Sequence, residues 1–316
     1  MILLNPPTSQ TSRIIINPIF NKISTPVIEK LASPSGQINY TFDTIDGKPT
    51  TATSTAKIFQ LQTGQVSFGY LNKIYLTAKS LGFDTEIVKH TKTDNITEFD
   101  NGRQRLSIDI QNYNFIYEYR FADEPDMFKD VRFPEKEESE QKAKNFLTLV
   151  DRYPEELSKG KTNAIFFNYN PQDQVMNRVE DSSQANMVEV DFFRPDIDNF
   201  PIVSPLNLNS QNYVIMMFTN DGFKILRAQV KFFETDQSKI GIYPLITGDE
   251  AFAKLQAGEA YFLKFQENQS DVTIKKMFLA YLDPDVYQPY LQPVYVFWGD
   301  NEFSAYVPAV HPDFLQ

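Results

Sequence analysis

Hydrophobic residues in this chain follow two different periods. Over residues 69–81 they recur every three or four positions, which predicts a helix with one buried face, and Gly82 supplies a left-handed helix end. Elsewhere hydrophobic and polar residues alternate, the period of a strand. The stretches that predict strands are 37–43, 56–66, 83–89, 105–110, 115–121, 164–169, 187–193, 213–219, 223–234, 260–266, 272–281, 294–298 and 303–307. The pattern therefore predicts many strands and few helices.

Local signals predict two more helices and one hairpin. The helix over residues 135–150 begins with a run of glutamates, and negative charge at a helix start is favoured by the helix dipole. The helix over 247–258 begins with a capping box, Thr247-x-x-Glu250. The run Asn220-Asp221-Gly222 predicts a hairpin turn, because Asn and Gly tolerate positive φ.

The order of these elements predicts a repeated α+β unit. Residues 57–121 and 223–310 both run strand, short helix ended by Gly, then three or more strands, although the two segments share little identity. With 27 Phe and 16 Tyr, the composition also favours sheets. We therefore predict an α+β fold in which antiparallel sheets are each packed by a short helix, as in a duplicated module.

Length and proline placement predict the division of the chain. A chain of 316 residues is long for one core, since domains average roughly 150 residues. Residues 1–35, with prolines at 18, 26 and 34, predict a proline-rich linker and an extended segment. The acidic, proline-broken stretch 122–134 predicts a boundary between an N-terminal α+β domain, 36–134, and a C-terminal α+β domain, 135–316.

Composition limits the classes of partner and the cellular compartments that we expect for this protein. The net charge of −11, with no basic face, argues against a nucleic-acid partner. The absence of Cys excludes disulfides and thiolate chemistry and favours an exported protein. No run reaches the roughly 20 apolar residues of a membrane helix. Residues 5–12 are typical of a linker behind a membrane anchor, so we expect an extracytoplasmic protein anchored through a segment upstream of Met1.

Few residues are suited to catalysis. The only histidines, His90 and His311, lie far apart in the sequence, so we predict no catalytic histidine, no metal site and no cofactor. The acidic groups at 191–198 and 283–285 lack the spacing of a calcium-binding loop. A carboxylate pair for glycoside hydrolysis stays open, because the fold and not the spacing brings such a pair together.

Aromatic and acidic residues near the C-terminus are the best candidates for ligand contact. Rings in this region can line a groove for a peptide or glycan, or they can pack in the core. The loop before the strand at 294–298 is the best place for exposed rings. The candidate contact residues are Tyr281, Asp283, Asp285, Tyr287, Tyr290 and Trp298.

The last hundred residues also resemble a known family. The shared features are Tyr243-Pro-Leu, Glu250-Ala251, Leu255, Gly258, Lys276 to Tyr281, Gln292 to Phe297 and Ala305 to Val310. This pattern resembles the C-terminal part of the YycH/YycI-type accessory regulators of bacterial sensor kinases, which belong with PepSY-like modules. The chain is also similar to uncharacterised membrane-anchored ectodomains of small-genome bacteria.

The resemblance implies a PepSY/cystatin-like fold and a non-catalytic, envelope-facing role. The expected function is thus an extracytoplasmic binding or regulatory module that contacts a partner protein or a cell-envelope ligand, attached to the membrane only through an anchor absent from this chain. The alternative is a secreted hydrolase with a carboxylate pair in an aromatic-lined cleft. Two carboxylates about 5 to 9.5 Å apart in such a cleft would distinguish the hydrolase.

Overall fold

Two β-sheets lie side by side in the computed structural model, which describes residues 15–28, 34, 36, 38–266 and 269–316. The first sheet has ten strands in the order β3-β4-β5-β6-β13-β12-β10-β8-β9, with β7 beside β12, and its neighbours are antiparallel. Its strands are β3 (Thr91–Thr93), β4 (Ile96–Asp100), β5 (Gln104–Asp109), β6 (Phe115–Tyr119), β7 (Val131–Arg132), β8 (Lys161–Asn170), β9 (Val175–Val179), β10 (Met187–Phe193), β12 (Tyr213–Thr219) and β13 (Gly222–Val230).

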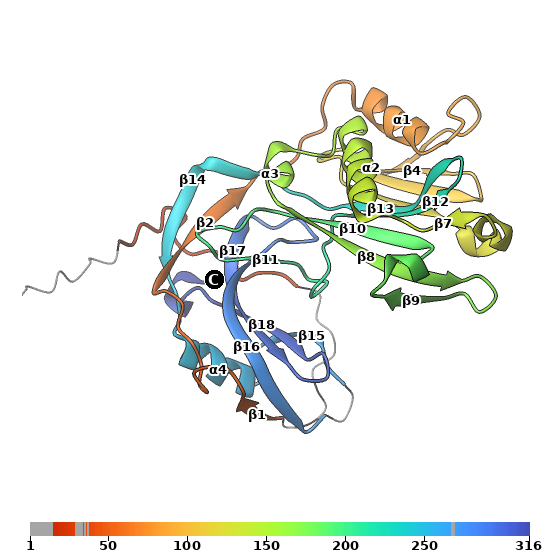
Figure 1. Cartoon of the computed structure of the whole chain (residues 1–316). Coiled ribbons are helices and arrows are strands. Elements are labelled where there is room, and N and C mark those ends of the chain that lie inside the picture. Colours follow the sequence, from red (N-terminus) through yellow and green to blue (C-terminus); the bar gives the residue numbers. More distant parts are fainter. Residues whose placement is uncertain (1–14, 29–33, 35, 37, 267–268) are drawn as a thin grey trace, which may run out of the picture.

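The second sheet has eight strands and is strongly curved (Figure 1). Its main order is β1-β16-β17-β18-β15, and β2 joins it by pairing with β14 and β17. Its strands are β1 (Asn39–Phe42), β2 (Thr55–Leu61), β11 (Ile202–Val203), β14 (Thr235–Pro244), β15 (Tyr261–Lys264), β16 (Asp271–Leu282), β17 (Tyr290–Gly299) and β18 (Ser304–Pro308). Among the described strands of this sheet, only β1 and β11 run parallel to a neighbour, in both cases β16.

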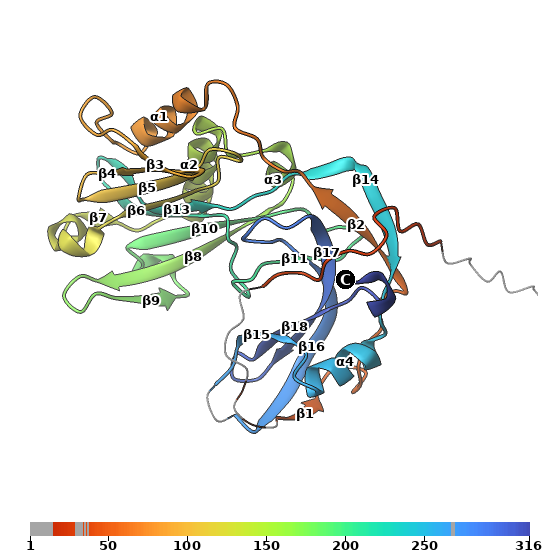
Figure 2. The ribbon, with the colours of Figure 1, turned by 180° about the vertical axis from the view of Figure 1, so that it is seen from behind.

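Helices cover one side of each sheet, which gives two lobes (Figures 1 and 2). In the first lobe, α1 (Tyr70–Ser80) and α2 (Lys136–Leu149) pack on the ten-stranded sheet, and their buried residues belong to its core. In the second lobe, α4 (Gly248–Gln256) packs on the eight-stranded sheet. The short α3 (Glu155–Ser158) lies where the lobes meet. Single 3-10 turns are η1 (Phe121–Asp123), η2 (Pro125–Phe128), η3 (Ser182–Gln184) and η4 (Pro312–Phe314).

The predicted α+β class is confirmed, and so are the predicted helices. The helix α1 ends before Gly82, which has a φ of 85°, and α4 begins with the complete Thr247–Glu250 capping box. The hairpin between β12 and β13 also forms, with Thr219 paired to Gly222. The backbone conformation of this turn differs from the prediction, because neither Asn220 nor Gly222 has a positive φ.

Some strand predictions are wrong. Residues 83–89 form turns, because the Asp84 side chain accepts a hydrogen bond from the backbone N–H of Glu86 and closes the chain on itself. The strands β3, β4, β7, β9, β11 and β14 were not predicted. In β9 every residue is exposed or half-buried, so it has no buried face to produce an alternating pattern.

The chain passes repeatedly between the two sheets. The strand β2 belongs to the second sheet, yet α1 follows it in the first lobe, and β13 of the first sheet is followed by β14 of the second. Both predicted repeat segments therefore begin on one sheet and finish on the other. The expected boundary at Pro134 lies between β7 and α2, and the first sheet takes strands from both sides of it.

The extended segment 15–28 lies against the second lobe. Asn17 pairs with Ile242, and Ile23 pairs with Leu315 and is fully buried. The remaining predictions for the linker, on residues 1–14 and 29–33, fall outside the described residues. Within the described part of the chain, no helix is long and apolar enough to cross a membrane.

Candidate functional site

A buried arginine joins the two lobes. Arg194 follows β10 of the first sheet, and its side chain is only 1% exposed. Its Nε donates to Oδ1 of Asp283 at 2.7 Å, and Nη1 donates to Oε1 of Glu156 at 2.5 Å. Asp283 directly follows β16 of the second sheet, and Glu156 lies in α3. One guanidinium thus connects both sheets and the helix between them.

The same guanidinium also binds the segment that leads from β13 to β14. Its Nη2 donates to the carbonyl of Phe233, and it stacks on the ring of Phe232 with 3.9 Å between Cζ and the ring centroid. Burial opposes the charged form of Arg194, but the attraction of Asp283 and Glu156 outweighs it and raises the pKa of the guanidinium. The junction therefore contains a fixed, fully paired positive charge.

The predicted contact residues separate into buried and accessible ones. Tyr281 is fully buried and packs against Phe59 at 6.2 Å, and burial raises the pKa of its hydroxyl. Asp283 is buried in its ion pair with Arg194. Tyr281 therefore belongs to the core of the second lobe, and Asp283 holds the junction through Arg194. The sequence did not indicate Arg194.

The other four predicted residues reach the surface. Asp285 is half-buried and forms an ion pair with Lys231 at 3.5 Å. Tyr287 is exposed and packs edge-on against Phe233, whereas Tyr290 packs against Phe20. Trp298 lies at the far end of β17, where its ring meets Phe278. The structure therefore places Asp285 and Tyr287 at the junction and Trp298 away from it.

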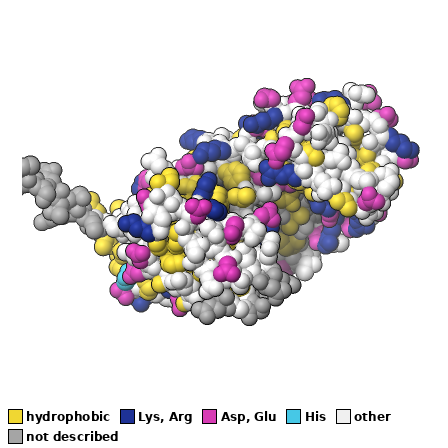
Figure 3. Space-filling model, turned by 60° about the horizontal axis from the view of Figure 1, so that its bottom comes forward, with side chains coloured by type: hydrophobic (Ala, Val, Ile, Leu, Met, Phe, Trp, Pro, Cys, Tyr) yellow, Lys and Arg dark blue, Asp and Glu magenta, His cyan; other side chains and the backbone are white. Residues whose placement is uncertain are grey.

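A cleft of about 520 Å³ opens between the lobes, and we call it the junction cleft. Figure 3 shows hydrophobic side chains gathered in the hollow between the two lobes. The cleft is lined by Arg178, Pro205, Leu206, Asn207, Leu208, Asn209, Leu263, Lys264, Asp285 and Glu302. Two leucines of this lining, Leu206 and Leu208, are 47% and 55% exposed. The charged residues at its edge have both signs.

The loop that carries these leucines is attached to both lobes. Its Asn209 Nδ2 donates to Oε1 of Glu189 in the first sheet at 3.0 Å. The hydroxyl of Tyr306 in the second sheet donates to the carbonyl of Ser204 at 3.1 Å. Within the loop, Ser204 Oγ donates to the Asn209 carbonyl at 2.5 Å. The leucines are therefore presented on a loop of fixed shape.

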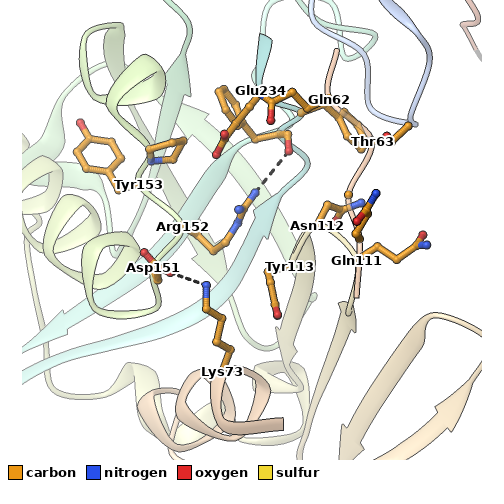
Figure 4. A pocket seen from close by; sticks show the side chains of 15 residues that line it. Gln62, Thr63, Lys73, Gln111, Asn112, Tyr113, Asp151, Arg152, Tyr153 and Glu234 are labelled. Carbon is orange, nitrogen blue, oxygen red and sulfur yellow. Dashed lines mark hydrogen bonds and ion pairs between the residues drawn. The ribbon is translucent and has the colours of Figure 1, made fainter. Parts of the chain in front are cut away.

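A second pocket of about 430 Å³ lies beside the junction, and we call it the polar pocket (Figure 4). It shares no lining residue with the junction cleft. It is lined by Gln62, Thr63, Gly64, Gln65, Lys73, Gln111, Asn112, Tyr113, Asp151, Arg152, Tyr153, Pro154, Phe232, Phe233 and Glu234. No sequence signal indicated it, because its residues come from five separate segments.

Two carboxyl groups are buried together behind the loop. Glu189 and Asp191 alternate with apolar residues on β10 and share one face of the sheet. Burial and the neighbouring charge of Glu189 raise the pKa of Asp191 to about 8. Neither residue lines the junction cleft or the polar pocket. Among the described residues, no group of three His, Asp or Glu side chains is placed to hold a metal ion.

The two histidines make local contacts in different lobes. His90 Nδ1 lies 3.1 Å from the hydroxyl of Tyr75 and its ring packs edge-on against that tyrosine. His311 Nδ1 accepts a hydrogen bond from the backbone of Asp313 and caps a 3-10 turn. Local contacts therefore account for the position of each histidine side chain.

Comparisons with known proteins do not assign this chain to a family. No family model matches the chain, and no curated protein matches it. An uncharacterised protein from Eubacterium rectale is 12% identical, with 89% of this chain and 90% of that chain covered and a TM-score of 0.39. The Bacillus megaterium YpeB C-terminal domain is 14% identical, with 78% and 95% covered and a TM-score of 0.33. With TM-scores below 0.5, neither similarity assigns an activity, and the resemblance to YycH/YycI-type regulators stays a prediction.

Proposed function

We propose that this chain is a non-catalytic binding module that holds an apolar segment of a partner protein in the junction cleft. The observation that carries the proposal is the pair of exposed leucines, Leu206 and Leu208, on a loop attached to both lobes. Exposed apolar residues grouped in a concave site are typical of an interaction surface.

The surroundings of the leucines support a protein segment as the ligand. An apolar centre inside a polar rim is the usual arrangement of a protein interface. Here the rim carries Arg178, Lys264, Asp285 and Glu302. Because the loop is held by hydrogen bonds at both ends, little conformational entropy is lost when a partner binds.

The hydrolase alternative has weaker support in this cleft. Its two acidic lining residues are each in an ion pair: Glu302 with Lys264 at 2.7 Å, and Asp285 with Lys231 at 3.5 Å. Hydrolysis by a carboxylate pair needs one member free to donate a proton. The buried Glu189 and Asp191 do not line the cleft, so they do not supply the missing group.

A peptide selection tests the binding proposal. Peptides would be selected from a displayed random library on the intact chain, and their affinities measured by calorimetry. We expect apolar peptides whose affinity falls at least about tenfold in the double variant Leu206→Asp, Leu208→Asp, as for loss of central hot-spot residues. The control is Ile87→Asp, an apolar residue that is 78% exposed and does not line the junction cleft. Equal losses in both variants, or none in the first, would overturn the proposal.

The extracytoplasmic location is part of the same proposal. It rests on the absence of Cys and on the linker composition of residues 5–12. The gene sequence upstream of Met1 tests it directly. An apolar run of about 20 residues there would support an anchored ectodomain, whereas a reading frame without any export or anchor segment would contradict it.

A further inference from the structure

The polar pocket lies where two passages of the chain between the lobes run side by side. Residues 62–65 lead from β2 to α1, and residues 232–234 lead from β13 to β14. The backbone N–H of Gln62 donates to the carbonyl of Glu234 at 2.8 Å, which joins the two passages. A ligand in this pocket would therefore contact two of the connections between the lobes.

Four charged residues line the pocket, and two of them neutralise each other. Lys73 Nζ lies 2.9 Å from Oδ2 of Asp151 and 4.7 Å from the ring centroid of Tyr113 (Figure 4). The other two, Arg152 and Glu234, attract each other at longer range. Neither forms an ion pair with any residue that the structure describes. The pocket thus holds one positive and one negative charge that remain available to a ligand.

Arg152 is the better buried of these two charges, at 8% exposed. Its Nη2 donates to Oδ1 of Asn114 at 2.8 Å and to the Phe232 carbonyl at 3.4 Å. Its Nε is enclosed and has no hydrogen-bond partner in the described structure. Nη1 also makes no hydrogen bond to the described residues, so it is the donor that a ligand can meet. A buried guanidinium without a carboxylate partner favours an anionic group beside it.

The wall of the pocket is fixed before any ligand arrives. Tyr113 and Asp151 both have left-handed backbone conformations, with φ of 59° and 55°. Such conformations are costly for residues other than glycine and cluster at binding sites. Gly64 lies so close to the chain that a Cβ there would be 2.5 Å from the Gln111 carbonyl oxygen. The pocket is therefore a rigid site of the size that small ligands need.

We propose that the polar pocket binds a small zwitterion, of the class of a free α-amino acid or a very short peptide. Its carboxylate would face the guanidinium of Arg152, and its ammonium group would face Glu234. The unpaired charges have opposite signs, so a ligand with both charges satisfies them together. A phosphate is disfavoured, because Arg152 is the one positive charge of the pocket without an ion pair among the described residues and Glu234 would repel the second negative charge of the phosphate.

A panel of small probes tests this inference by thermal shift and calorimetry on the full chain. The probes are single amino acids, dipeptides, acetate, ethylamine and inorganic phosphate. We expect one or more amino acids or dipeptides to raise the melting temperature, while acetate and ethylamine bind at least about tenfold more weakly. Binding of phosphate alone, acetate as effective as the amino acids, or no shift with any probe would each overturn the inference.

Two variants separate the roles of the charges. Glu234→Gln changes an exposed side chain and should weaken amino-acid binding about tenfold without changing the weak binding of acetate. Glu86→Gln, an exposed residue elsewhere in the first lobe, is the matched control and should have no effect. Arg152→Lys should weaken binding of both amino acids and acetate. Unchanged amino-acid affinity in Glu234→Gln would contradict the assignment whether or not the arginine variant folds.

Discussion

At the scale of single residues, two buried arginines hold the passage between β13 and β14. Arg194 donates to the carbonyl of Phe233, and Arg152 donates to the carbonyl of Phe232. They differ in their partners, because Arg194 has two carboxylates and Arg152 has none within ion-pair distance among the described residues. The fold therefore supplies all the charged partners of Arg194, whereas Arg152 has hydrogen-bond donors that a ligand can use.

Removing one partner of Arg194 should cost much stability. The change Asp283→Asn keeps the shape but leaves a buried guanidinium with one carboxylate fewer, and we expect a loss of about 3 kcal/mol in the free energy of unfolding. Urea unfolding followed by circular dichroism measures it. The control Asp285→Asn breaks a more accessible pair with Lys231 and should cost less than about 1 kcal/mol. If both variants lost the same free energy of unfolding, the buried ion pair of Arg194 and Asp283 would contribute no more stability than the accessible pair.

Asp191 should make stability depend on pH. Its pKa is about 8 in the folded chain, against an ordinary value of 3.8 for an aspartate, so between these values the folded state holds a proton that the unfolded state releases. The free energy of unfolding should therefore fall as pH rises through this window. In Asp191→Asn the fall should be smaller, as measured by urea unfolding at about pH 5 and about pH 8. The exposed control Asp126→Asn should keep the slope of the wild type.

The sequence could not reveal these buried groups. Arg194 lies 38 residues from Glu156 and 89 residues from Asp283, and no local pattern links such distant positions. For Asp191 the sequence shows only that the acidic group at 191–198 lacks the spacing of a calcium-binding loop. An acidic residue within an apolar strand gives no sign of its neighbours. Asp283 was predicted for ligand contact, whereas its burial shows a structural role.

At the scale of elements, the sequence predicts the helices, because interactions between residues close together in the chain determine them. The helices α1, α2 and α4 carry their own apolar faces and end signals within a dozen or so residues. Strands depend on neighbours elsewhere in the chain. Residues 83–89 have the alternation of a strand, yet the turn at Asp84 prevails, and β9 exposes Val175 and Met176 without a buried face.

The capping box of α4 provides a test of a local interaction. Thr247→Ala removes the hydroxyl that accepts from the backbone N–H of Glu250 at 3.2 Å, and we expect a loss of about 1 kcal/mol in stability. Thr148→Ala, inside α2, removes only a hydroxyl that bonds the preceding turn, so it should be neutral or slightly stabilising. A loss of similar size in both variants, measured by urea unfolding, would show that the cap is unimportant.

At the scale of the whole molecule, the lobes do not follow the order of the sequence. The segment 36–134 supplies β1 and β2 to the second sheet and β3 to β7 to the first. Length and composition predicted two units, but they could not show which strands pair. The residues that line the junction cleft were beyond prediction for the same reason, since Pro205–Asn209 and Lys264 meet only through the pairing of distant strands.

Fragments test this interleaving. The isolated segment 36–134 would leave β6 without its partner β13 and β2 without β14, so we expect it to be unfolded or aggregated. Amide spectra recorded by NMR would show narrow dispersion, and mixing with 135–316 should restore the dispersed spectrum if the pieces reassemble. A well-dispersed spectrum from 36–134 alone would instead support an independent N-terminal domain.

The pairing of β2 also has a consequence for biosynthesis. Leu61 of β2 pairs with Thr235 of β14, and Gln60 pairs with Tyr290 of β17. A ribosome adds about 5 to 20 residues per second, so β2 emerges about 10 to 35 s before β14 exists. During that interval its apolar residues, which include Ile58 and Leu61, have no native partner strand. We therefore expect the newly made N-terminal segment to expose apolar side chains that chaperones can bind until most of the chain has been translated.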